Sequence, residues 1–496
     1  MLKKAITILL VLCTLFSLLA ACAESGNKNN TENEKNTDTS DPNAEDIPET
    51  TDILRADLPD NINFNGDTFT FLITGPEYGY GYYETKDIYT AEQTGEPLND
   101  AIYIRNRTIE DRFNINIAEF KSSSVVNTAK NAIAAGDATY DAIITMMYEC
   151  STLAQSNLIM NIKELPYVDL EKPWWDRNAE KDISIKNKLY FTACDMNTMI
   201  IMGTRLLIFN KKLIGDFLLD NPYDHVKNDT WVFDTYARMV KAVHMDVNGN
   251  GENDDEDVYG VIMENHSPYF HSVGFGERLT TNDAEGYPQI TFNTERLYTA
   301  ADKVWDLYFD EDVCRRVEKM KHTSDYTNVY TYARMALFTN DKFLFHISGP
   351  GIFHEFRNME SDFGILPMPK LDEQQSRYYH TFDPECVMLS APVTCDTEKT
   401  GIMFEAMAAE SRYTIIPAVS ETILKRKYVR DNESEFILDI VYESRTFDLC
   451  RMFGWGGLNS LMDSLTANKK RNLASEMAKI NDKVQAAINK TLEAFE

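Results

Sequence analysis

The chain has 496 residues, of which 49 are Lys or Arg and 78 are Asp or Glu, so its formal net charge at pH 7 is −29. Such an acidic chain repels a phosphate backbone, which argues against nucleic acid as a partner. The length is too great for one hydrophobic core and predicts two folded domains. We expect the chain to be a monomer.

An export signal is predicted at the N-terminus. Lys3 and Lys4 precede an uncharged apolar run over 5–18, which is followed by Leu19-Ala20-Ala21-Cys22. This sequence resembles the lipobox of bacterial lipoproteins, in which the cysteine receives a diacylglycerol thioether and becomes the first residue after cleavage. The resemblance implies that residues 1–21 are a lipoprotein signal peptide and that Cys22 anchors the protein to the outer face of the cell membrane. An ordinary signal peptide with an incidental cysteine is the alternative.

Residues 22–52 are predicted to form a disordered tether. They are rich in Asn, Glu, Thr, Ser and Asp, they include no aromatic residue, and Ile47 is their only large aliphatic residue. A segment of this composition cannot bury a core. A flexible chain of this length spans on the order of 30 Å, so the folded body would stay near the membrane and remain free to turn.

The first part of the folded body alternates strands and helices. The patterns predict strands over 68–74, 114–117 and 140–147, with helices over 99–113 and 126–135 between them. This order indicates a largely parallel sheet, whose ligands gather beyond the carboxyl ends of its strands. Tyr148 and Glu149 follow the third strand and are therefore predicted to bind a ligand. The loop after the first strand holds Tyr78, Tyr80, Tyr82 and Tyr83, which either stack on a ligand or cover the domain.

Several motifs along the chain resemble those of family 1 extracellular solute-binding lipoproteins of ABC-type carbohydrate transporters, which have the maltose-binding-like fold. They are Tyr140-Asp141-Ala142-Ile143-Ile144, Leu158-Ile159-Met160-Asn161-Ile162, Pro173-Trp174-Trp175-Asp176, Leu189-Tyr190-Phe191, Phe209-Asn210-Lys211-Lys212-Leu213 and Phe363-Gly364-Ile365-Leu366-Pro367-Met368-Pro369-Lys370. Together they cover nearly all of the folded body. The resemblance specifies the fold and not one particular sugar.

This resemblance implies an α/β, two-lobed type II periplasmic-binding-protein fold with hinge crossovers and C-terminal helices. Residues 53–195 would form the first part of lobe 1, residues 196–380 would form lobe 2, residues 381–430 would return to lobe 1, and residues 431–496 would form the C-terminal helices. The implied function is a membrane-anchored receptor that delivers a carbohydrate, an oligosaccharide above all, to the permease subunits of an ABC transporter. The chain would then not be an enzyme.

Within this frame, Asp195 lies in the first crossing between the lobes. A buried carboxylate needs a partner, which is either a sugar hydroxyl or a hydrogen-bond donor within the hinge. Pro268-Tyr269-Phe270 resembles the aromatic cleft loop of the maltose-binding fold, so Tyr269 is predicted to stack on a sugar ring. Trp455 stands among Gly454, Gly456 and Gly457, where it is either a second stacking ring, as the resemblance implies, or part of the core.

A calcium loop is predicted over 246–257. Residues 231–245 read as a helix with Thr230 as its N-cap, and the following residues place oxygen ligands at EF-hand spacing. The proposed ligands are Asp246, Asn248, Asn250, Glu252 through its backbone carbonyl, Asp254 and Asp257. Position twelve is Asp rather than Glu, and 258–263 reads as a strand instead of a helix, so the loop is only EF-like. An acidic surface turn without a bound ion is the alternative.

Two histidines, a pair of acids and the cysteines are weaker signals of function. His266 and His271 have no third ligand at a diagnostic spacing, which favours histidines with partners in the protein over a metal site. Asp383 and Glu385 suggest a glycoside hydrolase, and a surface adhesin is a further alternative. Six cysteines after the tether lack CxxC spacing and read as small buried residues.

Overall fold

The computed structural model describes residues 54–76, 84–425 and 432–496. The chain divides into two structural units, residues 1–54 and 55–496, and all the elements described below belong to the second unit. The predicted signal peptide, Cys22, the tether and the four tyrosines of 78–83 lie outside the described residues. Within the described ranges, no helix is long and apolar enough to cross a membrane.

Lobe 1 is built on a five-stranded sheet with the order β2-β1-β3-β13-β4. β1 (Asp67–Thr74) pairs in parallel with β2 (Ile115–Ser122) and β3 (Ala142–Met146), and β13 (Val387–Ser390) lies antiparallel between β3 and β4 (Phe191–Thr192). The predicted parallel strands are confirmed. The helices of this lobe are α2 (Pro97–Phe113), α3 (Val125–Ala134), α4 (Met147–Gln155), α5 (Arg177–Ile183) and α13 (Thr397–Lys425).

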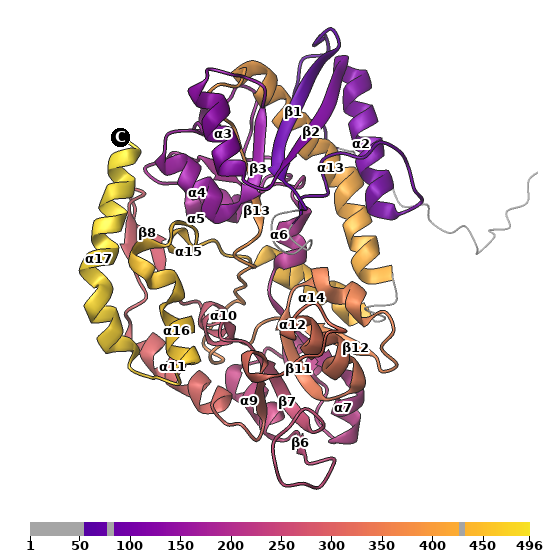
Figure 1. Ribbon diagram of the computed structural model, residues 1–496, viewed down its shortest axis with the longest axis vertical. Coiled ribbons are helices and arrows are strands. Elements are labelled where there is room, and N and C mark those ends of the chain that lie inside the picture. Colours follow the sequence, from indigo (N-terminus) through magenta and orange to yellow (C-terminus); the bar gives the residue numbers. More distant parts are fainter. Residues whose placement is uncertain (1–53, 77–83, 426–431) are drawn as a thin grey trace, which may run out of the picture. The chain divides into compact units, whose positions relative to one another are not determined.

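Both faces of the lobe 1 sheet are buried. Phe71 and Ile73 pack in one apolar cluster, whereas Leu72, which points to the other face of β1, packs in another. Helices α2 and α13 lie side by side against β1 and β2 (Figure 1). Burial on both faces explains the nearly continuous apolar sequence of β3, β13 and the second half of β1, whereas the edge strand β2 leaves residues such as Phe120 exposed.

Lobe 2 is built on a second sheet with the order β10-β7-β11-β5-β12, and a short strand, β6, pairs with β7. Its strands are β5 (Leu206–Asn210), β6 (His244–Met245), β7 (Val258–Met263), β10 (Cys314–Arg316), β11 (Phe343–Ser348) and β12 (Phe363–Leu366). A separate hairpin pairs β8 (Thr280–Asn282) with β9 (Pro288–Ile290). The helices are α7 (Lys211–Asp216), α8 (Pro222–Lys227), α9 (Phe233–Lys241), α10 (Ser267–Gly274), α11 (Glu295–Tyr308) and α12 (Val329–Tyr332).

The predicted N-cap of α9 is wrong. The helix begins at Phe233 with Val232 at the cap, and Thr230 instead hydrogen-bonds His225. The reason is tertiary, because Val232 forms a β-bridge with Lys370 and the Phe233 N–H donates to the Lys370 carbonyl at 2.7 Å. The helix also ends at Lys241 rather than at residue 245, since His244 and Met245 pair with β7 as a strand.

Three segments that pair with one another run between the lobes in the described part of the chain, which confirms the predicted hinge crossovers. The first crossing runs over 193–205 and contains α6 (Thr198–Gly203), the second runs over 367–386, and the third runs over 444–448. They pair with one another through bridges between Thr204 and Phe382 and between His380 and Arg445. The second crossing therefore lies between the other two, and backbone hydrogen bonds hold all three together.

The C-terminal part is helical, as predicted. It consists of α14 (Asn432–Glu443), α15 (Leu449–Phe453), a 3₁₀ segment η7 (Trp455–Ser460), α16 (Leu461–Ala467) and α17 (Leu473–Ala494). Helix α15 contacts α4 of lobe 1, and α16 contacts α10 of lobe 2. Met477, Val484 and Ile488 recur at helical spacing on α17 and are buried. The six cysteines after the tether are free thiols, and all except Cys395 are buried.

Candidate functional site

In both sheets, the carboxyl end of a central strand lies next to a crossing. The strand register shows this for β3 in lobe 1 and for β11 in lobe 2. Met146, the last residue of β3, pairs with Val387, so Tyr148 and Glu149 share an edge of the lobe 1 sheet with Glu385. In lobe 2, Ser348 at the end of β11 pairs with Leu206, which follows Arg205. Because ligands of α/β sheets bind beyond the carboxyl ends of parallel strands, this is where we place the candidate site.

Charged side chains from four parts of the chain meet at this place. We call Arg205, Glu264, His266, Asp383, Glu385, Arg451 and Asp463 the crossing cluster. Arg205 from the first crossing forms an ion pair with Asp383 from the second, and its guanidinium lies 5.1 Å from the ring centre of Phe270. These contacts hold the guanidinium in one orientation.

Asp383 and Glu385 form a carboxyl pair within the second crossing. Their side chains are hydrogen-bonded, and the Glu385 N–H donates to Asp383 Oδ1 at 3.1 Å. Burial raises the pKa of Glu385 to about 8, and the contact with Asp383 acts in the same direction. Burial would also raise the pKa of Asp383, but the charge of Arg205 and the hydrogen bonds from Glu385 together outweigh it and hold that pKa below its ordinary value. The pair therefore holds one proton, on Glu385, at neutral pH.

The lobe 2 side of the cluster joins α10 to the C-terminal helices. His266 Nδ1 lies 2.7 Å from Asp463 Oδ2, and the Arg451 guanidinium lies 3.6 Å from the same oxygen. Burial would lower the pKa of His266, but the hydrogen bond to Asp463 and the negative charge of that residue together raise it above its ordinary value. Burial raises the pKa of the nearby Glu264 despite the opposing charges of Arg205 and His266.

Several buried polar atoms at this place have no hydrogen-bond partner in the described part of the chain. They are Asn265 Oδ1, Tyr269 Oη, Arg451 Nε and Asp463 Oδ1. Buried polar atoms are nearly always hydrogen-bonded, so a group of them in one region indicates that a polar ligand or water completes their bonding. The cluster combines donors and acceptors, which suits a ligand with many hydroxyl groups.

The structure places Tyr148 and Glu149 at the start of α4, beside the second crossing. The Met147 N–H donates to the Cys386 carbonyl at 3.1 Å, which brings the helix start next to Glu385. Tyr148 is 38% exposed, whereas Glu149 is buried and accepts a hydrogen bond from the Thr145 hydroxyl. That both residues contact the ligand stays a prediction, and Tyr148 has the more accessible side chain.

Asp195 lies between β4 and α6, where it has a partner within lobe 1. Arg412 of α13 donates to Asp195 Oδ2 at 3.1 Å. Burial raises the pKa of Asp195 to about 6, although the charge of Arg412 opposes the rise. This contact is a hydrogen bond within the protein, one of the two partners expected from the sequence. The predicted contact with a sugar hydroxyl is untested.

Tyr269 and Trp455 do not expose a ring face in this structure. Tyr269 is 1% exposed, with the guanidinium of Arg451 at 4.8 Å from its ring centre. Trp455 is 2% exposed, stacks on Phe453 and donates its indole N–H to Thr491 at 2.8 Å. Gly456, at φ +62°, lets this turn approach α17 so closely that an added Cβ would lie 2.8 Å from Cα of Val484. Stacking of either ring on a ligand stays a prediction and would require these neighbours to move.

The two histidines lie in separate environments. His266 bonds Asp463, whereas His271 is buried and bonds the Tyr308 hydroxyl at 2.8 Å. Burial lowers the pKa of His271 to about 3. Both histidines thus have partners in the protein. Among the described residues, no group of three or more His, Cys, Asp or Glu side chains could hold a metal ion.

All residues of the predicted calcium loop, 246–257, lie in the part of the chain that the structure describes. Asn248 and Asn250 both donate to Asp254 Oδ2, at 3.0 and 2.8 Å, so three of the predicted ligand side chains converge on one point. Asp246 accepts from the Gly249 and Gly251 N–H groups, and Asp257 accepts from the Val247 N–H. Turning the two amides would direct their carbonyl oxygens toward the same point, and it would break the bonds that these oxygens accept from the Asn250 and Glu252 N–H groups. The convergence fits a cation with oxygen ligands, and calcium binding stays a prediction.

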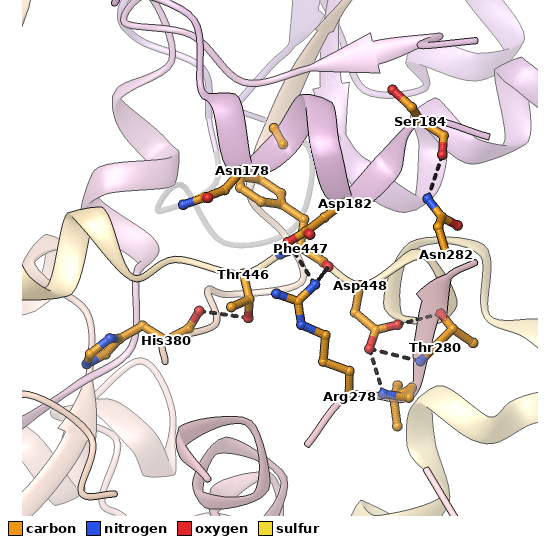
Figure 2. A network of polar contacts seen from close by, with 12 residues as sticks. Asn178, Asp182, Ser184, Arg278, Thr280, Asn282, His380, Thr446, Phe447 and Asp448 are labelled. Atoms are coloured by element: carbon orange, nitrogen blue, oxygen red, sulfur yellow. Dashed lines mark hydrogen bonds and ion pairs between the residues drawn. The ribbon is translucent and has the colours of Figure 1, made fainter. Parts of the chain in front are cut away.

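A second polar network joins the lobes at α5. Asp182 forms an ion pair with Arg278 at 2.8 Å and accepts a hydrogen bond from the Phe447 N–H (Figure 2). Asp448 accepts from the Leu279 and Thr280 N–H groups and from the Thr280 hydroxyl. These bonds fix the third crossing between α5 and the start of β8.

The sequence of residues 108–404, more than half of the chain, matches the family model of bacterial extracellular solute-binding proteins. The chain belongs to this family. No curated protein sequence matches it.

Solved structures with the same fold span nearly the whole folded body. A cyclo/maltodextrin-binding protein complexed with maltotetraose is 14% identical, with a TM-score of 0.53, and the match covers 86% of this chain and 96% of that one. An ABC transporter solute-binding protein from Thermotoga lettingae, bound with α-D-tagatose, is 12% identical, with a TM-score of 0.52 and coverages of 85% and 100%. RafE from Streptococcus pneumoniae, in its apo form, is 11% identical, with a TM-score of 0.51 and coverages of 87% and 97%.

As a member of the extracellular solute-binding family, the chain is a non-catalytic receptor of an ABC transporter. The geometry of the carboxyl pair agrees with this conclusion. A glycoside hydrolase separates its two carboxyl groups by about 5–10 Å so that they flank the scissile bond. Asp383 and Glu385 instead bond each other directly.

Sequence reasoning missed Arg451 and Asp463 as members of the site in this solute-binding protein. A signal was present, because Arg451 is a single cation between the apolar residues of Leu449–Phe453. A charged residue on a buried helix face needs a partner, but the sequence could not show that the partner is Asp463. Arg205 was visible as an interruption between two apolar segments, and only the fold pairs it with Asp383.

Proposed function

We propose that this receptor binds a carbohydrate, an oligosaccharide above all, at the crossing cluster and delivers it to an ABC permease. The observation that carries the proposal is the group of buried donors and acceptors supplied by lobe 2, by the crossings and by the C-terminal helices. Arg205 and Glu385 come from the crossings, His266 comes from lobe 2, and Arg451 comes from the C-terminal helices. Ligand contact with all of these parts would favour one arrangement of the lobes.

The chemistry of the cluster supports a neutral, hydroxyl-rich ligand. Arg205 and Arg451 each face carboxyl groups, so the cations are already balanced by acids of the cluster. Charged groups hydrogen-bond hydroxyls more strongly than neutral groups do, and each hydroxyl can donate and accept at once. Two structures with the same fold hold carbohydrates, maltotetraose and α-D-tagatose.

A glycan screen followed by calorimetry tests the proposal. The full chain in detergent should bind a neutral saccharide and leave it intact. His266→Ala should weaken binding by about tenfold, because it removes a hydrogen bond supported by a charged partner. His354→Ala is the matched control, since the imidazole of this exposed histidine bonds the Gly351 carbonyl within its own turn. Cleavage of the saccharide, or binding only to a host surface protein, would overturn the proposal.

We further propose that Cys22 carries a lipid and holds this receptor at the outer face of the membrane. The basis is the sequence Leu19-Ala20-Ala21-Cys22 after an apolar run. A polar tether of about 30 residues would leave the body free to meet a permease while it stays within on the order of 30 Å of the bilayer.

A further inference from the structure

A cavity of about 300 Å³ lies between α5 of lobe 1, the segment before β8 of lobe 2 and the second crossing. Its charged lining residues are Lys181, Asp182, Glu277, Arg278 and Arg377. None of the residues that line it belongs to the crossing cluster. The volume is at the lower end of the range for ligand sites, about 300–1,000 Å³.

Both acids of this cavity are already paired. Asp182 bonds Arg278 at 2.8 Å, and Glu277 bonds Arg296 at 2.5 Å and accepts a hydrogen bond from the Thr294 hydroxyl. Each carboxylate is therefore neutralised by an arginine beside it. The acids leave little negative potential to oppose an anion in the cavity.

Lys181 and Arg377 have no such partner. Within the described part of the chain, no carboxylate lies at ion-pair distance from either side chain. The guanidinium of Arg377 lies 4.6 Å from the ring centre of Tyr379, and this stacking limits its orientations. A stacked guanidinium keeps its N–H donors free around its edge, ready to bond an oxyanion.

We propose that this cavity binds a small oxyanion, a phosphate or a carboxylate, between Lys181 and Arg377. Lys181 comes from lobe 1 and Arg377 from the second crossing, so the anion would join the two. Threonine hydroxyls of the lining offer further donors, among them Thr281. In a chain with a formal net charge of −29, a cavity with two unpaired cations is a local exception to the prevailing charge.

Calorimetric titration of the full chain in detergent with inorganic phosphate, and separately with galacturonate, tests this site. The two probes distinguish a free inorganic ion from the carboxylate of an acidic sugar, and binding of either supports the proposal. Lys181→Gln and Arg377→Gln should each weaken binding by about tenfold, because each removes a charge-assisted contact. Lys130→Gln on α3, which removes an exposed lysine outside the cavity, should bind like the parent.

Three results would overturn the site: no heat with either probe, the same heat with chloride at equal ionic strength, or unchanged affinity in both cavity variants. Both cavity side chains are exposed, so the variants should unfold at the parent temperature, and that measurement accompanies the titration. The test does not depend on the proposed carbohydrate site. Variants that lose the anion should still bind the saccharide, and failure of the parent to bind any saccharide would leave this result unaffected.

Discussion

The carboxyl pair of Asp383 and Glu385 sets the local charge of the second crossing. Glu385 keeps its proton because burial disfavours its charged form and the ionised Asp383 lies against it. Asp383 stays ionised because Arg205 stabilises its charge. One ion pair and one neutral carboxylic acid therefore occupy a place where two adjacent negative charges would repel each other.

This pair predicts a pH dependence of folding stability. The pKa of Glu385 rises from about 4.5 to about 8 on folding, so the folded state binds more protons than the unfolded state between these values. The contribution of Glu385 to stability is fully present below about pH 4.5 and is lost as the pH rises through about 8. Glu385→Gln imitates the protonated form and should remove this loss. Denaturant unfolding at about pH 5 and about pH 8 checks it, and the prediction is wrong if the stability of the variant relative to the parent is the same at both.

The burial of Trp455 predicts a loss of stability when the ring is removed. Trp455→Ala should lower the free energy of unfolding by about 3–5 kcal/mol, because it leaves a cavity beside Phe453 and removes the indole hydrogen bond to Thr491. Tyr148→Ala should change it much less, since that side chain is 38% exposed. Denaturant titration measures both. Equal effects of the two substitutions would contradict the packing role of Trp455.

At the scale of elements, the loop over 246–257 joins α9 and β6 to β7. Its side chains bond its own backbone, with Asp246 and Asp257 at the two ends. Asn248 and Asn250 converge with Asp254 in the middle of the loop. A cation here would bind at the edge of lobe 2 and would stabilise that lobe by mass action.

Calcium is expected to raise the melting temperature of the full chain, and a chelator should reverse the rise. Asp254→Ala should abolish the calcium effect, because Asp254 is the point on which the two amides converge. Asp283→Ala, in the exposed turn between β8 and β9, serves as the control. Thermal unfolding with and without calcium measures the effect. Identical melting temperatures under both conditions would favour an acidic turn without an ion.

At the scale of the whole molecule, the three crossings connect two sheets that each have a core on both faces. The crossings pair through isolated bridges and not through a continuous sheet, so few hydrogen bonds resist a change in their geometry. The crossing cluster and the α5 network both lie along these segments. Ligands at either place would therefore act on the same three connections.

The proposed lipid anchor predicts labelling at a single residue. Full-length protein expressed in a bacterium should incorporate labelled palmitate, and Cys22→Ser should abolish the incorporation because the thioether cannot form. Cys13→Ser, within the apolar run, should retain the label and controls for changes in export. Gel fluorography of the membrane fraction measures the outcome. Label that persists in the Cys22→Ser protein would contradict the anchor.

The sequence by itself determined the first strands and helices of lobe 1, because their apolar periodicity depends only on near neighbours. The strands at 67–74 and 142–146 and the helix at 97–113 are examples. The order of family motifs likewise predicted the fold, and the end of the third strand placed Tyr148 and Glu149 at the carboxyl edge of the lobe 1 sheet. These signals are local or follow from chain order, so no tertiary contact was needed to detect them.

Only the tertiary structure decided which charged side chains meet. Arg205 and Asp383 are 178 positions apart, and His266 and Asp463 are 197 positions apart. The sequence could not predict these pairs because many acids could neutralise each cation. It also could not decide whether Tyr269 and Trp455 face a ligand or the core. An aromatic ring stabilises either environment, and the choice depends on the approach of Arg451 and of α17 in the folded chain.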